Sequence, residues 1–251
     1  MSRKSYADIF NFQYMNILLG IQPTGRIHIW NYFGAIKKGL DMQSEWHKVI
    51  FLVANHHANA SYIETINMLN ALDRLWAIDY ESQWHLVLEL FYKLSHSTSV
   101  SELARLPQYQ TKEQSLHMLS YPLLMACDII MSDCDAVIVW DDQEPHMHFY
   151  REIARRNDYK IATTIKSDTP RIMSVKDPSI KMSKSLWDDH CIYIDDSLDE
   201  IQRKIKAMPT TDVGLQALND LAKLFSVTFD PLQCWSSKVT LSESIYNYFN
   251  K

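Results

Sequence analysis

The chain has 251 residues, with 25 Lys and Arg against 30 Asp and Glu, a formal net charge of −5. Hydrophobic residues make up 47% and aromatic residues 12%, which excludes an intrinsically disordered chain and allows a sizeable core. The negative charge argues against broad nucleic-acid binding, so an RNA partner would need a local basic surface. Without a membrane-length apolar run or a secretory signal pattern, we expect a cytoplasmic protein, with an organelle as the alternative.

Apolar runs alternate with helical patterns along the first half of the chain. In order, we predict a strand at 17–19, a helix ending near residue 42, a strand at 49–54, a helix at 62–78 and a strand at 86–92. The second half continues with a buried helix at 116–131, a strand at 136–139, an amphipathic helix at 147–156, a strand-like run at 192–194, and helices at 198–207, 215–225 and 241–249.

Strands separated by helices favour right-handed crossovers and a parallel sheet covered on both faces. The fold class is therefore predicted to be α/β, with a Rossmann-like parallel sheet and a small C-terminal helical domain. The predicted divisions are an N-terminal extension at 1–15, a Rossmann-type catalytic domain at 16–195 and a helical domain at 196–251.

Cysteine and histidine patterns give no metal signal. The four cysteines show no C-x-x-C spacing, which suits a reducing compartment. Two histidine pairs, at 56–57 and 146–148, lack a flanking ligand set, so we predict no protein metal site.

The first motif runs from Gly20 to Ala35 and follows the apolar run at 17–19. A strand, a turn rich in Gly and Pro, and then a helix is a layout that places a nucleotide phosphate at a helix N-terminus. Many strand-to-helix turns contain glycine, so this motif is only moderately specific.

The second motif is the run Lys181-Met182-Ser183-Lys184-Ser185. Lysine offers an ammonium on a flexible stem, and the serine hydroxyls between and beside the lysines can donate to phosphate oxygens. A solvated basic loop is the common alternative. The presence of the first motif in the same chain favours a phosphate-handling loop.

Together the two motifs resemble the nucleotide-binding motifs of class I aminoacyl-tRNA synthetases, and residues 20–35 resemble tryptophanyl-tRNA synthetases in particular. Residues 121–129, 137–146 and 171–178 carry the resemblance further. It extends from about residue 17 to 212, with an apparent deletion around 97–113. The resemblance implies activation of L-tryptophan with ATP and Mg²⁺, transfer to tRNA(Trp), a homodimer and no membrane association.

The resemblance also implies roles for individual residues. The catalytic residues would be Lys181, Ser183 and Lys184. The ATP-binding residues would be Gln22, Thr24, Gly25, His28, Asn31, Asp142, Gln143, Met182 and Ser185. The tryptophan-binding residues would be His57, Met125, Asp128 and Gln143. Asp128, one turn from Met125 on the same helical face, would accept the indole N–H; pairing with a lysine or capping a turn is the commoner use of such an Asp.

The sequence departs from the family pattern at several places. Trp30 and Trp140 stand where the family has glycine, which permits close backbone approach to a nucleotide. A codon that the cell reads as glycine would explain both. Gln114 replaces an expected lysine and Asn55 an expected aspartate. The last residues resemble only the start of the helix that the family uses for the anticodon, so we expect anticodon reading to be reduced.

Two other interpretations stay open. The chain could be a tyrosyl-tRNA synthetase, which shares the architecture, or a non-catalytic relative that binds tryptophan or RNA. Candidate basic patches for RNA lie at 151–160 and 203–206, and each is equally well explained as the solvated face of a helix.

Overall fold

The structure is a computed structural model that describes residues 14–54, 57, 77–78, 84–111, 114–167, 169–183 and 186–250. By its internal contacts the chain divides into two compact units, and each is described by itself. The first unit takes residues 1–23, 38–62 and 69–167, and the second takes 24–37, 63–68 and 168–251. The domains predicted from the sequence, a catalytic domain at 16–195 followed by a helical domain at 196–251, remain a prediction.

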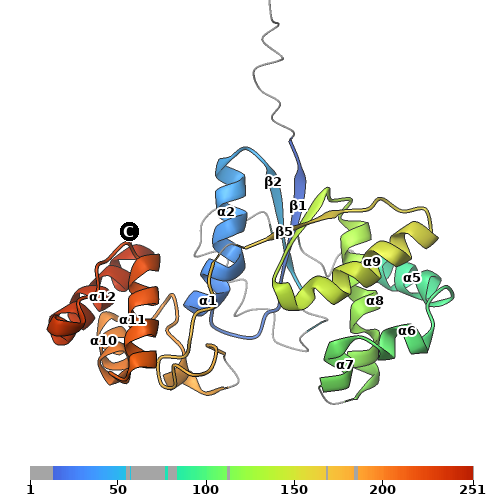
Figure 1. Cartoon of the computed structure of the whole chain (residues 1–251). Coiled ribbons are helices and arrows are strands. Elements are labelled where there is room, and N and C mark those ends of the chain that lie inside the picture. The colour runs from blue at the N-terminus through green and yellow to red at the C-terminus, as the bar shows by residue number, and fades with distance from the viewer. Residues whose placement is uncertain are drawn as a thin grey trace, which may run out of the picture. The chain divides into compact units, whose positions relative to one another are not determined.

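The first unit contains a five-stranded sheet in the order β3-β2-β1-β4-β5, with all neighbouring strands parallel. Strands β1, β2 and β5 are labelled in Figure 1. The strands are β1 (Asn16–Ile21), β2 (Lys48–Val53), β3 (Ala77–Ile78), β4 (Ala136–Val139) and β5 (Thr163–Lys166). The predicted α/β parallel fold is confirmed. In this strand order the connections reverse direction between β1 and β4, and ligands of doubly wound sheets bind beyond the carboxyl ends of the strands at such a point.

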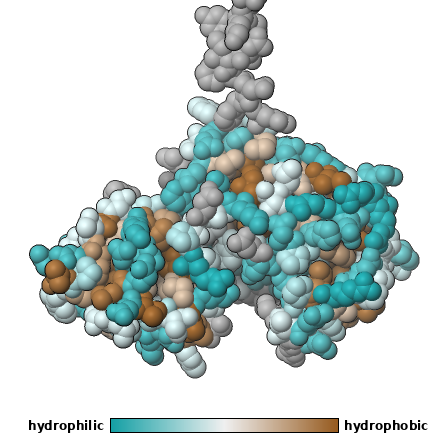
Figure 2. Space-filling view, viewed as in Figure 1, coloured by the Kyte–Doolittle hydropathy of each residue, from teal (hydrophilic) through white to brown (hydrophobic). Residues whose placement is uncertain are grey.

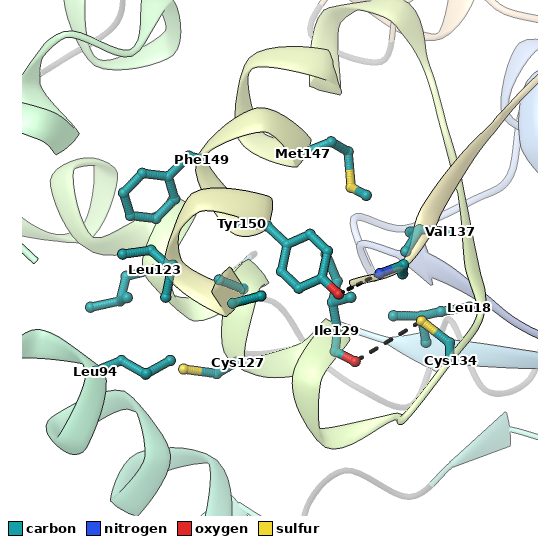
Figure 3. Close-up of a cluster of buried hydrophobic side chains, with 14 of the residues drawn as sticks. Leu18, Leu94, Leu123, Cys127, Ile129, Cys134, Val137, Met147, Phe149 and Tyr150 are labelled. Carbon is teal, nitrogen blue, oxygen red and sulfur yellow. Dashed lines mark hydrogen bonds between the residues drawn. The ribbon is translucent and has the colours of Figure 1, made fainter. Parts of the chain in front are cut away.

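One face of the sheet is covered by α5 (Trp84–Ser95), α8 (Leu116–Met131) and α9 (Glu144–Arg156). Leu18 and Val137 of the sheet point into this cluster of buried side chains with Leu123 and Tyr150 from the helices (Figure 3), and Ile50 belongs to the same cluster. The Tyr150 hydroxyl accepts a hydrogen bond from the backbone N–H of residue 162 and donates to the carbonyl of residue 160. The core therefore fixes α8 and α9 against the sheet.

The opposite face is covered by α2 (Lys37–Ser44). A Cβ atom on Gly39 would lie 2.9 Å from the Phe51 ring and 3.3 Å from Leu19, so glycine lets this helix approach the sheet closely. Alternate residues of β1 and β2 thus face α2, while the residues between them face α8. Burial on both faces explains why these strands read as unbroken apolar runs.

The prediction of a strand at 86–92 is wrong, because these residues belong to α5. The buried side chains of this helix are Val87, Leu90 and Leu94, which share one helical face, while Leu88 and Tyr92 are exposed. A short apolar run is compatible with either a strand or a buried helix segment, and only the spacing of its buried residues distinguishes the two. Short helices α6 (Val100–Ala104) and α7 (Pro107–Thr111) follow, and a reciprocal capping box between Ser99 and Glu102 starts α6.

Three further differences concern strands. β5 is partly exposed and polar, which hid it from the apolar pattern. Residues 77–78 form β3 at the end of the predicted helix 62–78, whose residues up to 76 lie outside the described part. In the run 192–194, Tyr193 makes a single isolated bridge to His28 instead of a longer ladder.

The second unit contains residues 24–35 of the first motif and the C-terminal helices. The motif leads from α1 (Ile29–Asn31) through a π-helical turn, η2 (Tyr32–Ile36), toward α2. The predicted helices are confirmed as α10 (Leu198–Ala207), α11 (Asp212–Leu224) and α12 (Cys234–Phe249), and short 3₁₀ turns lie at Asp188–His190 and Pro231–Gln233.

An aromatic cluster joins η2 to the last two helices of this unit. The ring centroid of Phe33 lies 5.2 Å from that of Phe225 and 5.5 Å from that of Tyr248, and the latter two lie 5.3 Å apart. The two pairs with Phe225 are edge to face, and such packing adds about 0.5–1.5 kcal/mol for each pair beyond area burial. The C-terminal helices therefore stabilise the conformation of the first motif.

The visible surface is largely hydrophilic, with hydrophobic patches between polar residues (Figure 2). Within the described ranges, no helix has the length and apolar character needed to cross a bilayer.

Candidate active site

At the end of β1, Gln22 reaches the hydroxyl of Tyr121 on α8. Its side-chain amide Nε2 donates to that oxygen over 3.3 Å. Burial raises the pKa of Tyr121, the Gln22 hydrogen bond opposes the rise and the nearby charge of Asp142 adds to it. The tyrosine stays a neutral hydrogen-bonding group at neutral pH, and it links the strand end to the helix.

Asp128 lies two turns further along α8, on the same face as Tyr121 and Met125. Its carboxylate is buried, and Oδ2 lies 2.7 Å from Nε2 of His57, which is buried as well. His57 Nδ1 has no hydrogen-bond partner among the residues that the structure describes. Two residues predicted to bind tryptophan, His57 and Asp128, are therefore in direct contact. This contact is neither an ion pair with a lysine nor the cap of a turn, the two alternatives considered for Asp128.

Three rings surround the same spot in the first unit. The Tyr121 ring meets the His57 ring edge to face, with centroids 4.7 Å apart, and the His146 ring at 5.3 Å. His146 is buried at the first turns of α9, and His117 Nε2 lies 3.3 Å from the backbone carbonyl of His57. The carboxylate of Asp128 therefore lies among aromatic side chains, a setting that suits a flat aromatic ligand with one polar N–H.

The turn after β4 holds the next predicted residues. Its 3₁₀ helix η4 (Asp141–Gln143) leads directly into α9, and the Gln143 backbone N–H donates to the carbonyl of Trp140 over 2.9 Å. Gln108 of α7 donates its amide to the carbonyl of Asp142 over 2.7 Å. Asp142 is exposed and Gln143 half-buried, so both side chains remain accessible at the carboxyl end of the sheet.

In the second unit, the turn of the first motif is set by Gly25 and His28. Gly25 has φ 89°, a conformation that glycine adopts without a steric penalty. His28 is buried and caps α1, because its Nδ1 accepts the backbone N–H of Asn31 over 3.1 Å. Thr24 is exposed. Asn31 Oδ1 is buried without a hydrogen-bond partner in the described part of the chain, which leaves an acceptor for a donor such as a ribose hydroxyl.

Behind this turn, a partly buried ionic network holds Arg26. Its Nη2 donates to Asp196 Oδ1 over 2.8 Å, and its Nε donates to Asp195 over 3.0 Å. Asp196 Oδ2 accepts from Lys204 Nζ of α10 over 2.6 Å and from the Tyr193 backbone N–H over 3.0 Å. Partial burial lowers the pKa of Arg26, but hydrogen bonds and charges of the two carboxylates outweigh it and raise the pKa.

The cations of this network lie over one ring. The Arg26 guanidinium carbon is 4.2 Å and the Lys204 Nζ 5.0 Å from the centroid of the Tyr193 ring. Cation–π attraction adds to the ion pairs. The network joins the first motif to α10, so it fixes the backbone next to Gly25.

The lysine motif is anchored by its second residue. Met182 is buried, and its backbone N–H donates to the carbonyl of Ile172 over 3.0 Å, while Lys181 makes an antiparallel bridge to Met173 and is exposed. Lys184, Ser185 and Asn55 lie outside the described residues. Of the motif, the structure places Lys181 exposed and Ser183 half-buried, on either side of the buried Met182.

Ion pairs neutralise much of the first predicted basic patch. Arg151 pairs with Glu144 at 3.2 Å, Arg156 with Glu102 at 2.7 Å and Lys160 with Asp135 at 2.8 Å. In the second patch, Lys204 is buried, and Arg203 pairs with Asp189 at 2.9 Å. The pairing favours the interpretation of both patches as solvated or structural helix faces.

Sequence reasoning missed two kinds of contributor. Tyr121 carried a usable signal, since it precedes Met125 and Asp128 by four and seven residues on one helix. Arg26 carried none, because its partner Asp196 lies 170 residues away in sequence. No described group of three or more His, Cys, Asp and Glu side chains could hold a metal ion.

Comparison with known proteins gives consistent results. A family model described as tRNA synthetases class I (W and Y) matches residues 13–61 and 59–244. The tryptophan–tRNA ligase of Helicobacter pylori is 32% identical over 232 residues, which cover 81% of this chain and 71% of that protein. The corresponding ligase of Rickettsia prowazekii is 31% identical over 263 residues, covering 94% of this chain and 79% of that protein.

Solved structures agree at the level of the fold. The tryptophanyl-tRNA synthetase of Mycoplasma pneumoniae superposes with a TM-score of 0.76 at 22% identity, covering 94% of this chain and 86% of that one. That of Campylobacter jejuni, solved in complex with ADP and tryptophan, has a TM-score of 0.74 at 26% identity, covering 94% and 86%.

Proposed function

The chain belongs to the class I tRNA synthetases of the tryptophan and tyrosine group, and from this premise we propose that it activates L-tryptophan with ATP and transfers it to tRNA(Trp). The observation that carries the choice of tryptophan is the buried Asp128 carboxylate among aromatic rings on α8. A tryptophan side chain offers one N–H to such an acceptor while its ring system fills apolar space.

Activation needs little acid–base chemistry from the protein. The tryptophan carboxylate attacks the α-phosphorus of ATP, and pyrophosphate leaves with the negative charge of the broken P–O bond. The rate then depends on alignment of the reactants and on stabilisation of phosphate charge. Mg²⁺ enters with ATP as part of the substrate, because that ion commonly uses few protein ligands in nucleotide sites.

In this proposal, Asp128 accepts the indole N–H and His57 holds the carboxylate in place over 2.7 Å. Met125, partly buried against the core cluster, would pack on the indole, and Gln143 would bind the amino group of tryptophan. A phenylalanine ligand would leave the carboxylate without its indole donor, at a cost of about 1–3 kcal/mol or more for a charged group.

The nucleotide is assigned to the turns. Gln22, Thr24, Gly25, His28 and Asn31 would hold phosphates and ribose, with Asp142 and Gln143 at the ribose as well. Lys184, with Lys181, Ser183 and Ser185, would stabilise the leaving pyrophosphate. The buried Met182 side chain supports a positioning role, with only its backbone left for ATP.

The experiment is amino-acid-dependent exchange of pyrophosphate into ATP, measured with tryptophan, tyrosine and phenylalanine in parallel. Tryptophan is expected to support exchange with the highest kcat/KM. Exchange that tyrosine supports better would assign the chain to the tyrosyl branch. Tryptophan binding in calorimetry without any exchange would favour the non-catalytic interpretation.

Assembly and location are also proposals. A homodimer is supported by Leu88 and Tyr92, exposed one turn apart on α5, which a second copy would cover. Light scattering on the purified chain would test it, with Leu88→Glu expected to shift the mass toward a monomer. A reducing cytoplasm is supported by four cysteines without a disulfide, three of them buried.

A further inference from the structure

Glycine is scarce in this chain and tryptophan is plentiful. The 251 residues include five glycines and seven tryptophans, whereas about 7% of residues are glycine on average. A parallel α/β fold with many tight turns needs glycine at specific places. Either the turns avoid glycine conformations, or other residues occupy them.

Trp46 occupies a backbone conformation that strongly favours glycine. Its φ is 69°, and it follows the end of α2. Its N–H donates to the carbonyl of Gln43 over 3.0 Å, and the N–H of His47 donates to that of Met42 over 3.1 Å. This pair of bonds is the Schellman motif, in which the left-handed residue after the helix is usually glycine.

Trp187 occupies an even more restrictive conformation. It has φ 81° and ψ 157° and lies just before the 3₁₀ turn at Asp188–His190. That region of backbone space is essentially limited to glycine. Gly25, the one described glycine with positive φ, has a similar φ of 89°. The remaining described residues with positive φ are the smaller polar residues Asp133, Asp158 and Ser226.

Neither indole gains contacts that would offset this strain. Trp46 and Trp187 are each 82% exposed, so burial contributes little at either position. A tryptophan side chain therefore brings a steric cost and almost no packing at these two places. The backbone argues for glycine independently of any family resemblance.

Backbone conformation and exposure thus lead to the same residue type. The backbone strongly favours glycine at positions 46 and 187, and both indoles are largely exposed. We propose that both positions are glycine in the natural protein, because the cell reads these codons as glycine. The inference does not depend on the proposed function.

The test compares two substitutions at one site. Trp187→Gly removes both the indole and the Cβ, whereas Trp187→Ala removes the indole and keeps the Cβ. We expect the glycine variant to melt about 2–4 °C higher than the alanine variant, and the same difference between Trp46→Gly and Trp46→Ala. Trp235→Gly, at an exposed site in the right-handed helix α12, should melt no higher than Trp235→Ala.

Equal melting temperatures for the glycine and alanine variants at positions 46 and 187 would overturn the backbone argument. Peptide masses of the protein isolated from its own cells test the codon argument, with glycine expected at positions 46 and 187. Tryptophan at positions 46 and 187 in those peptides would overturn the proposal whatever the melting temperatures show.

Discussion

The residues assigned to tryptophan and those assigned to ATP are held in different ways. In the first unit, Met125 and Asp128 project from the core helix α8, and the Asp128 carboxylate lies 2.7 Å from His57, which follows β2. In the second unit, the residues assigned to ATP between 24 and 31 lie on the turn of the first motif, which the network of Arg26, Asp196 and Lys204 holds from behind. Under the proposed function, amino-acid choice would rest on side chains in mutual contact, and nucleotide binding in part on a turn fixed by charged side chains.

This difference has a consequence for mutations. Changes at the contact between His57 and Asp128 should act on the choice of amino acid. Changes in the second unit should act on the rate and on folding, since its charged network holds backbone rather than substrate. Substitutions at Asp196, Lys184 and Asp128 test this separation, and Glu102→Gln is a surface change in the first unit that should affect stability alone.

The largest effect is expected for Asp196→Ala. The change leaves the Lys204 ammonium buried without its carboxylate, and breaking a buried pair costs about 3–5 kcal/mol. Denaturant unfolding should show a loss of that size. Asp189→Ala removes the exposed partner of Arg203 and serves as the control, with little change expected. Equal losses in the two variants would show that the buried network has no special role.

Lys184→Ala should reduce pyrophosphate exchange by about 10²–10³-fold, because a preorganised charge on the transition state contributes about 2.7–4 kcal/mol. Tryptophan binding, measured by calorimetry, should change little. Lys176→Ala, at an exposed lysine eight residues earlier, is the matched control. Exchange within a few-fold of the unsubstituted chain would remove Lys184 from the proposed mechanism.

Asp128→Ala should lower kcat/KM for tryptophan by a factor that corresponds to about 1–3 kcal/mol of lost transition-state stabilisation. The ratio of kcat/KM for tryptophan to that for phenylalanine should fall as well. ATP affinity should remain nearly unchanged. Asp128→Asn should be milder, since an amide oxygen still accepts the indole proton. His57→Gln tests the contact between the two residues, with a smaller loss for tryptophan expected. A full tryptophan preference in Asp128→Ala would make Asp128 a structural residue.

Glu102→Gln should have the smallest effect. Hydrogen bonding to Arg156, with the Ser99 backbone, lowers the pKa of Glu102 to about 2 in the folded chain. Because the pKa of Glu102 is lower in the folded chain than in the unfolded chain, its ionised carboxylate stabilises the fold fully above the unfolded pKa near 4.5. This stabilisation is lost as the pH falls toward the folded pKa of about 2. At pH 7 the variant should lose about 0.2–1 kcal/mol, and the difference should vanish near pH 2. A difference that persists there would assign the effect to packing.

Elements with strong periodicity could be predicted from the sequence. The helix at 116–131 and the strand at 136–139 match α8 and β4 residue for residue, because a long apolar helix and a buried β-branched run have few alternatives. The run at 86–92 failed because two exposed leucines masked its helical period. The partly exposed β5 gave no apolar signal, since its place in the sheet depends on pairing with β4.

The candidate site divides in a similar way. Residue types and motif spacing were enough to propose Asp128 and the lysine motif. The contact between His57 and Asp128 joins residues 71 positions apart, and the Arg26 network joins residues 170 positions apart. Such contacts follow from the chain's path through the fold and have no local sequence pattern. Strain at Trp46 and Trp187 could be seen only once the backbone angles were known.

The most direct measurement of the central claim is charging of tRNA. The purified chain would be incubated with ATP, Mg²⁺, radiolabelled amino acid and bacterial tRNA, and label in acid-precipitable RNA would be counted over time. Our account predicts that tryptophan is attached to tRNA and that tyrosine is not, both in the chain and in its Trp30→Gly, Trp140→Gly variant. Attachment of tyrosine in preference to tryptophan, or exchange activity with no charging by either protein, would contradict it.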